Sequence, residues 1–275
     1  SDTYLGSTPA GARGETFTLT TSIDNVTGTA GNDVFNASIA LQDPTDVGST
    51  TQTLTAFDEI DGGAGTDRLN ATLNSADADH VLIENVENFY LRSRDDTSAI
   101  DMDTVSGVEQ LWSDRSTNDL TLTNVGNAVT VGLNDVDASA DYSITYADNA
   151  LESSAYTQTV VANGAGSTAD DVQLDIITGG TDAITSLTVS TTSATGGNFL
   201  DVGTGGNLNG VETLTVTGSG SLSFDEQGAT FGTGLETVAA GDYTGDLSLT
   251  AANDTLQTVT TGSGDDSITL GGTLA

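Results

Sequence analysis

The feature of this sequence that most constrains its fold is a short motif that recurs at a nearly constant interval. The motif has the form apolar-Glu-x-apolar, and four copies centre on Glu87, Glu109, Glu212 and Glu236, while a fifth carries Gln257 in place of glutamate. Within the two clusters the spacings are 22 (87 to 109), 24 (212 to 236) and 21 (236 to 257). A repeat of this length matches one coil of a β-solenoid, in which each coil buries its few apolar residues only against its neighbours.

The segments between these motifs have the pattern of short β-strands. β-Branched and apolar residues alternate with polar ones in runs such as TFTLTTS at 16–22, SLTVST at 186–191 and TLTVTG at 213–218. Alternation with a period of two, interrupted by Gly, Asn and Asp, indicates strands, and no segment has the apolar spacing of a long amphipathic helix. We therefore predict an all-β fold, a β-solenoid or parallel β-helix. A β-sandwich built from similar strands is the alternative.

The composition fits a thin, repetitive core and excludes several functions. The chain has 275 residues, of which 36% are hydrophobic, and its 5 basic against 40 acidic side chains give a formal net charge of −35. Such a surface repels nucleic acid, which is bound through clusters of Lys and Arg. The apolar runs are far shorter than the roughly 20 residues of a membrane span, so no membrane insertion is expected. With no cysteine, disulfides and thiolate chemistry are excluded.

The chain is expected to divide into a short lead-in and one long solenoid region. Residues 1–15 are small and polar, with Pro and Gly, which is typical of a linker. Residues 16–275 form the expected solenoid region. The stretch 120–160 lacks the glutamate motif, which allows an insertion there. The chain begins without Met and shows no cleavable secretion signal, so we expect a processed fragment or an export signal elsewhere.

Three Gly-rich turns carry the most specific chemical signal. They lie within 24–36, 58–70 and 257–270, and the central one reads GGAGTDRL at 62–69. The pattern G-G-x-G-x-D-x-U, where U is apolar, is the nonapeptide that binds calcium in parallel β-helices. Its glycines permit a positive-φ turn that points carbonyl oxygens inward, and its Asp adds a carboxylate. The alternative is that these are ordinary surface β-turns, because Gly and Asp are the usual turn residues.

One such turn provides only part of a calcium site, since Ca²⁺ takes about six to eight oxygen ligands. Asp24 lies nine residues before Asp33, and Asp58 lies nine residues before Asp67, which suggests a second carboxylate for each of these turns. In the third turn the corresponding position is the neutral Gln257. We predict Ca²⁺ as the cofactor. The expected ligand positions are Asp24, Gly28, Ala30, Asn32, Asp33, Asp58, Gly62, Ala64, Thr66, Asp67, Ser263, Asp265 and Asp266.

With TFTLTTSIDNVTGTAGNDVFNAS at 16–38 and FDEIDGGAGTDRLNATL at 57–73, the chain resembles the RTX (repeats-in-toxin) calcium-binding surface-layer proteins of Gram-negative bacteria. The resemblance implies an extracellular protein of the cell surface, exported by type I secretion and assembled with calcium into a two-dimensional array or a fibre. It implies self-association, with cell-surface polysaccharide as a further partner. Thr29 and Thr261 depart from the family pattern, because they replace consensus glycines.

Two other functions remain open. One is an RTX adhesin segment that binds a glycan or a protein partner, and the other is a β-helical carbohydrate-active enzyme. Catalysis of the Ser-His-Asp or Cys-His kind would depend on His80 alone, since the chain has one histidine and no cysteine. We therefore expect a protein that is not an enzyme.

Tyr90 and Trp112 lie in the most cation-rich stretch of the chain, beside Arg92, Arg94 and Arg115. This stretch is interpreted either as a contact patch for an acidic neighbouring subunit or as ordinary local packing.

Overall fold

The computed structural model describes residues 13–43, 46–76, 78–192, 196–202, 207–224, 234–251 and 256–270. Within these ranges the chain forms 24 strands and one short 3₁₀ helix, Asn207–Gly210. No helix in this part of the chain has the length and apolarity that a membrane span requires. The prediction of an almost entirely β protein is confirmed. The expected lead-in falls mostly outside the described residues, which begin at residue 13.

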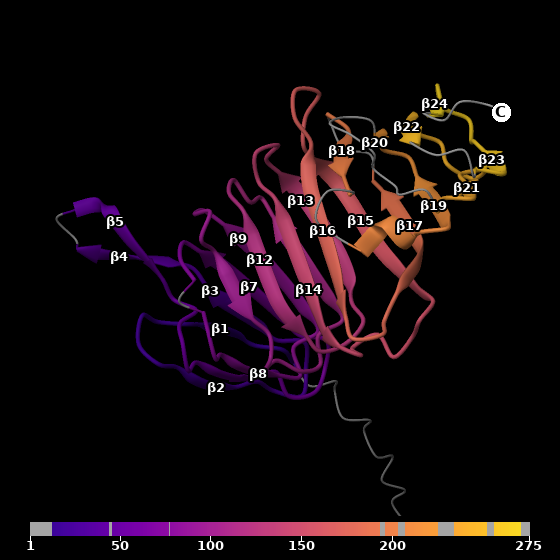
Figure 1. Cartoon of the computed structure of the whole chain (residues 1–275). Coiled ribbons are helices and arrows are strands. Elements are labelled where there is room, and N and C mark those ends of the chain that lie inside the picture. The colour runs from indigo at the N-terminus through magenta and orange to yellow at the C-terminus, as the bar shows by residue number, and fades with distance from the viewer. Residues whose placement is uncertain are drawn as a thin grey trace, which may run out of the picture.

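Two long parallel sheets run the length of the molecule (Figure 1). Sheet 1 contains, in spatial order, β1 (Thr16–Thr18), β3 (Val34–Ala37), β7 (Arg68–Leu73), β9 (Asn88–Ser93), β11 (Gln110–Asp114), β13 (Thr130–Val136), β15 (Tyr156–Ala165), β17 (Ile184–Thr191), β19 (Thr213–Gly218), β21 (Thr237–Ala239) and β23 (Thr258–Thr260). Sheet 2 contains β10 (Ala99–Asp101), β12 (Leu120–Val125), β14 (Tyr142–Asp148), β16 (Val172–Gly179), β18 (Asn198–Asp201), β20 (Leu222–Phe224), β22 (Leu247–Ala251) and β24 (Ser267–Leu270).

A third, smaller sheet and one hairpin complete the fold. Sheet 3 contains β2 (Asn25–Thr27), β6 (Glu59–Asp61) and β8 (Leu82–Glu84), which are also parallel. The pair β4 (Ile39–Asp43) and β5 (Asp46–Gln52) is antiparallel and projects from the N-terminal part of the molecule (Figure 1). From β9 onward, consecutive strands alternate between sheets 1 and 2, so each coil contributes one strand to each. This is the predicted β-solenoid, and its parallel pairing excludes the antiparallel β-sandwich.

The glutamate motif marks the same point in successive coils. Strands β9 and β11, β19 and β21, and β21 and β23 pair in the registers that the motif predicts, at spacings of 22, 24 and 21. The amide of Glu109 donates to the carbonyl of Glu87 at 2.9 Å, and that of Glu236 donates to the carbonyl of Glu212 at 2.8 Å. The motif therefore stacks on itself where the chain enters sheet 1.

Other coils are longer or shorter than the motif predicts. Asn36 in β3 pairs with Asn70 in β7, a separation of 34 residues, because hairpin β4–β5 is inserted in that coil. Asn134 in β13 pairs with Asn163 in β15, a separation of 29 residues. The segment 120–160, where the sequence allowed an insertion, supplies strands β12 to β15 to the two long sheets.

Alternation along the strands builds the core. In β7 and β9, every second side chain is buried, and the buried residues of neighbouring strands are direct partners. One fully buried column of such partners contains Phe35, Leu69, Phe89, Leu111, Val131, Val160, Val189 and Val216. Burying each of these side chains contributes about 1.5 to 3 kcal/mol. Each coil can therefore bury its apolar residues only when its neighbours are in place.

Candidate metal-binding turns

The structure brings two of the three predicted turns together and separates the third. In the first turn Asp33 directly precedes β3, and in the second Asp67 directly precedes β7; these strands are neighbours in sheet 1. In the third turn Asp266 precedes β24, which belongs to sheet 2. The first two turns thus stack on each other, while the third lies on a different side of the solenoid.

The stacked partner of each Asp lies in the next coil, not nine residues earlier in the chain. The amide of Asp24 donates to Oδ1 of Asp58 at 2.8 Å, and the amide of Asp33 donates to Oδ1 of Asp67 at 2.6 Å, across a separation of 34 residues in both cases. Asp24 and Asp33 belong to one coil, because a coil is much longer than nine residues. The sequence suggested that Asp residues nine positions apart pair with each other, but the Asp residues that stack are 34 positions apart.

The buried carboxylate of Asp33 accepts backbone amides from its own turn and from the neighbouring coil. Its carboxylate accepts hydrogen bonds from the amide of Glu15 at Oδ1 and from the amide of Thr29 at Oδ2, both at 2.6 Å, and from the Thr29 hydroxyl. Only 1% of its surface is exposed. Burial raises the pKa of Asp33, but these hydrogen bonds together outweigh burial and hold the pKa below its ordinary value. Both oxygens already have donors from the protein.

Asp67 differs from Asp33 in that its charge is poorly compensated. Its Oδ1 accepts the amide of Asp33, but its Oδ2 is buried and has no hydrogen-bond partner within the described residues. Burial first, and then the charges of Glu87, Asp33 and Asp61, raise the pKa of Asp67 above its ordinary value. Oδ2 of Asp67 is therefore a carboxylate oxygen that lacks a donor and lies among other acids.

Two further carboxylates extend this stack. The amide of Asp67 donates to Oε2 of Glu87 at 2.6 Å, which adds a third coil to the column. In the parallel column, Asp58 is fully buried and accepts the amides of Thr55 and Asp24. Burial, together with the charge of Asp24, raises the pKa of Asp58 despite these hydrogen bonds. Glu87 was identified in the sequence only as part of the repeat motif, and the structure adds it to the acidic column.

The glycines of the stacked turns are required by close backbone packing. A Cβ on Gly28 would overlap the carbonyl of Gly62, and a Cβ on Gly62 would overlap the carbonyl of Asn85. The turns are also joined directly, by the amide of Ala64 donating to the carbonyl of Thr29 at 3.2 Å.

The remaining predicted ligand positions of these two turns lie at the surface. Ala30, Asn32 and Thr66 are exposed. The amide of Thr66 donates to Oδ1 of Asn32 at 3.1 Å, which is a second direct bond between the two turns. The side-chain oxygen of Asn32 is thus used to join the coils.

The third turn stacks on a segment that the sequence did not reveal. Oδ1 of Asp266 accepts the first amide of β22 at 3.0 Å, and the amide of Asp265 donates to Oδ1 of Asp246 at 2.8 Å. The amide of Ser263 donates to the carbonyl of Tyr243 at 3.0 Å. The segment 241–246 has the same Gly and Asp content, but its spacing differs from the nonapeptide, so the pattern search missed it.

Acidic side chains also line a recess beside sheet 2. A cavity of about 500 Å³ is lined by residues that include Asp141, Asp170, Asp171 and Asp201. Burial, followed by the charge of Asp119, raises the pKa of Asp141. No spacing in the sequence pointed to this group, because its members come from three different coils.

One position in the stacked turns suits a cation, but it provides only part of a metal site. Among the described residues, no three or more His, Asp and Glu side chains are grouped so that they could hold a metal ion. Between the first two turns, direct hydrogen bonds join the coils, and both oxygens of Asp33 are used. The fit is better at Oδ2 of Asp67, a buried donor oxygen without a partner among the described residues and near the charges of Glu87 and Asp61. Calcium prefers such oxygen ligands.

The one histidine, His80, contacts the residue that precedes Asp58. It is exposed, and its ring stacks on that of Phe57 with 6.1 Å between centroids.

No protein-family model matches this chain, and no curated protein matches it significantly.

Proposed function

We propose that the protein is an extracellular structural subunit of a bacterial surface layer or fibre, a β-solenoid whose acidic turns respond to calcium. The observation that carries this proposal is the uncompensated carboxylate of Asp67 in a column of acids that crosses three coils. A buried charge that is repelled by neighbouring charges lowers stability. We therefore infer that this column has a function that requires the charge.

Hydrogen bonds within the chain hold these carboxylates in position. Stacking of Asp33, Asp67 and Glu87 aligns their carboxylates along one edge of the solenoid, and the amides between them fix the spacing of the coils. Bound calcium would supply positive charge at Oδ2 of Asp67 and offset the repulsion within this column. Across the molecule the net charge of −35 opposes compaction in the same way. Calcium would thereby couple folding outside the cell to the metal concentration there.

Self-association is supported by the open ends of the sheet. Within the described residues, sheet 1 ends at β1 and at β23, and the three residues of β23 are exposed. An unpaired strand edge presents backbone donors and acceptors to which another strand can add. Coils of separate copies stacked end to end would extend the same parallel pairing.

The test is chemical denaturation of the purified chain across a calcium titration that starts in EGTA. We expect calcium, but not equal magnesium, to raise the unfolding midpoint of the wild type, and Asp67→Asn to lose this response. Asp103→Asn is the matched control, because Asp103 is exposed and lies outside the column. An unfolding midpoint that is the same in EGTA and in millimolar calcium would refute calcium dependence.

Assembly is tested separately by size-exclusion chromatography and negative-stain imaging with and without calcium. Ordered sheets or filaments support the structural function. A chain that stays monomeric at every calcium concentration contradicts the structural function and favours the adhesin alternative. The specific observation for that alternative is the group of arginines in or next to β7, β9 and β11, namely Arg68, Arg92, Arg94 and Arg115.

A further inference from the structure

Four of the five arginines gather on one face of the solenoid. Arg68 lies in β7, Arg92 in β9, Arg94 directly after β9 and Arg115 directly after β11, and these three strands are adjacent in sheet 1. The chain carries 40 acidic residues, yet the described residues contain a single salt bridge, between Arg115 and the neighbouring Asp114 at 2.8 Å. Within the described ranges, Arg68, Arg92 and Arg94 form no salt bridge.

Arg92 is the centre of this group. Its Nε is buried and has no hydrogen-bond partner within the described residues. Burial first, and then the charges of Arg94 and Arg115, lower the pKa of Arg92. A buried guanidinium nitrogen without a partner, on a side chain repelled by two other cations, is costly unless an anion completes the site.

Two aromatic rings stack on each other beside the arginines. Tyr90 and Trp112 are direct partners on β9 and β11, and their rings stack with 5.5 Å between centroids and 5° between planes. The guanidinium of Arg68 lies over the Tyr90 ring at 3.6 Å, a cation–π contact. The next partner along the row is Gly132, and a Cβ there would overlap the Trp112 ring. Glycine at this position therefore gives the indole its place on the sheet.

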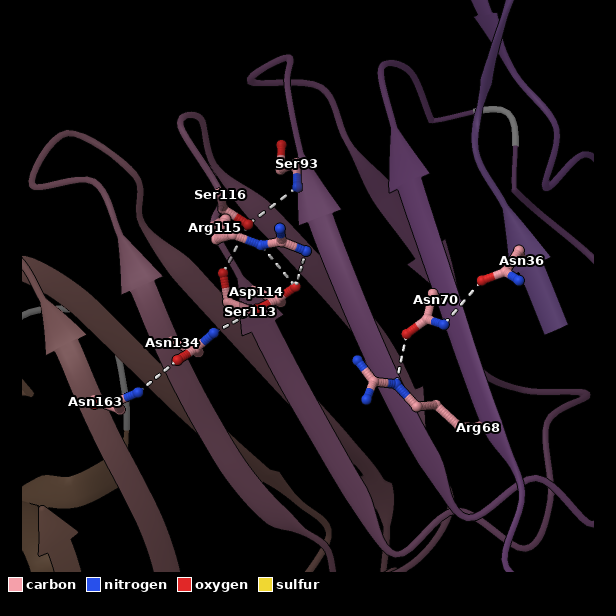
Figure 2. Close-up of polar contacts among 10 residues, drawn as sticks. All are labelled: Asn36, Arg68, Asn70, Ser93, Ser113, Asp114, Arg115, Ser116, Asn134 and Asn163. Atoms are coloured by element: carbon pink, nitrogen blue, oxygen red, sulfur yellow. Dashed lines mark hydrogen bonds and ion pairs between the residues drawn. The ribbon is translucent and has the colours of Figure 1, made fainter. Parts of the chain in front are cut away.

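Polar side chains of neighbouring strands are hydrogen-bonded to one another on the strands to either side of these rings; Figure 2 shows these polar contacts. On one side, the Asn70 amide donates to Oδ1 of Asn36 at 2.9 Å. On the other, the Asn163 amide donates to Oδ1 of Asn134 at 2.7 Å, and the Asn134 amide donates to Asp114 at 2.6 Å. These contacts fix the orientation of the amides, which retain further donor and acceptor capacity.

The face is hollowed along its length. Two recesses, of about 330 and 540 Å³, share the lining residues Arg68, Tyr90, Asp114 and Arg115. Together their linings extend from β3 to the end of β17, which is six strand spacings or about 29 Å at about 4.8 Å each. The groove runs across neighbouring strands, so it presents side chains at the regular spacing of the coils. Such a groove suits a linear polymer with a short repeat.

We propose that this groove binds an acidic oligosaccharide, one whose sugar units carry carboxylates. Arg68 and Arg92, which line the recesses, pair with the carboxylates, since a planar guanidinium matches a carboxylate through two hydrogen bonds. The asparagine amides beside the stacked rings bind the sugar hydroxyl groups.

A second copy of this acidic chain is a less suitable occupant. The buried core of a protein–protein interface is more apolar than the rest of the surface, although Tyr, Trp and Arg are also enriched there. The exposed large apolar residues of the described chain are Ile23, Leu41, Phe57, Leu82 and Val259, and none of them lines the groove. A groove lined by arginines, amides, two rings and the carboxylates of Asp114 and Asp135 fits a polar ligand better.

The test measures binding of a short oligogalacturonate to the monomeric protein by calorimetry, and by the fluorescence of its one tryptophan, which lies in the groove. We expect saturable binding, no binding of the carboxyl-reduced neutral oligosaccharide, and a weakening of about tenfold or more in Arg92→Gln. Arg68→Gln is a second variant at an exposed position that lines both recesses, and it decides the matter if Arg92→Gln does not fold. Arg13→Gln is the matched control, because it removes the same charge outside the groove.

Three results would overturn the proposal. They are no saturable binding by the folded wild type, equal binding of the neutral oligosaccharide, and equal loss of binding in Arg13→Gln. Self-association that Arg92→Gln abolishes and oligogalacturonate fails to compete would assign the groove to a second copy. The measurement is made both in calcium and in EGTA. Because the binding assay uses the monomeric protein, its result does not depend on whether the chain assembles or responds to calcium.

Discussion

At the scale of single residues, the fold repeats one device: an aspartate placed directly before a strand, whose carboxylate binds a neighbouring coil. Asp33, Asp67 and Asp266 each accept a backbone amide from an adjacent coil, and Asp119 does so for the amide of Asp141. A carboxylate in this position satisfies an amide that would otherwise lack a partner at the turn. This accounts for much of the abundance of Asp, whether or not a metal is bound.

The stability of the protein should respond in opposite ways when the charge of Asp33 or of Asp67 is removed by substitution with Asn. In EGTA at pH 7 we expect Asp33→Asn to lose about 1 to 3 kcal/mol, because one of its two amide donors then faces an NH₂ group. Asp67→Asn should gain stability, because it keeps an acceptor for the Asp33 amide and removes a repelled charge. Urea denaturation of both variants checks this. Destabilisation by both would contradict it.

The pH dependence of these differences follows from the direction of each pKa shift. Folding raises the pKa of Asp67 above 3.8, so its charge destabilises the protein above the folded pKa, and the advantage of Asp67→Asn should vanish as the pH falls through that value toward 3.8 and below. Folding lowers the pKa of Asp33, so its stabilisation is complete above 3.8 and is lost only as the pH falls through the lower folded pKa. Denaturation midpoints of wild type and both variants between pH 7 and acid measure the two trends; a gap for Asp67→Asn that widens on acidification would be inconsistent.

The position of Trp112 should depend on Gly132. We expect Gly132→Ala to displace the indole, to change its fluorescence and to cost about 1 to 3 kcal/mol, as overpacking does. Gly126→Ala is the control, because a Cβ there meets no atom within 4 Å. Fluorescence spectra and urea midpoints of both variants provide the comparison. Equal effects of the two substitutions would show that the overlap is relieved without moving the ring.

At the scale of elements, the sequence predicted strands well and coil lengths poorly. Runs of alternating Thr and Val became paired strands, and the glutamate motif gave the correct interval between the neighbouring coils that carry it. The long coil between β3 and β7 was not foreseen, because hairpin β4–β5 has the same alternating texture as the solenoid strands around it. That coil length, in turn, decides that Asp33 stacks on Asp67. The turns could thus be located from sequence, while the partners of their carboxylates could not.

The hairpin should be dispensable for the solenoid. Its base is already closed, since the amide of Thr53 donates to the carbonyl of Ser38 at 3.1 Å. We expect replacement of residues 40–51 by Asn-Gly, a favoured two-residue turn, to leave the far-UV circular dichroism unchanged and to move Tm by only a few degrees, about 1 kcal/mol or less. Leu69→Ala, in the core column, is the reference for a real loss, of about 2 to 5 kcal/mol. A replacement as damaging as Leu69→Ala would mean that the hairpin supports the fold.

At the scale of the whole molecule, a narrow apolar interior must overcome the repulsion of a strongly charged exterior. The core is a set of columns one side chain wide per coil, and the net charge is −35. Composition alone predicted both properties. The arginine groove was only partly visible in the sequence: Tyr90, Trp112 and three arginines are close in the chain, but Arg68 and the asparagines join them only through the register of sheet 1.

Stability in EGTA should therefore rise with ionic strength. Sodium chloride at about 0.3 M shortens the range of repulsion between exposed carboxylates well below its range at about 0.01 M. Each 1 kcal/mol of repulsion relieved should raise Tm by about 2 to 4 °C. Thermal melts in sodium chloride and, as a control for ion-specific effects, in tetramethylammonium chloride measure this. A Tm that falls or does not change with salt would contradict the charge argument.

The in-register parallel stacking also bears on how such a gene can change. Because each coil touches mainly the coils before and after it, duplication or loss of one coil by recombination leaves every other contact intact and shifts only the length of the molecule. Related genes should then differ in whole multiples of a coil more often than in scattered short gaps, and the groove across sheet 1 would lengthen or shorten in step.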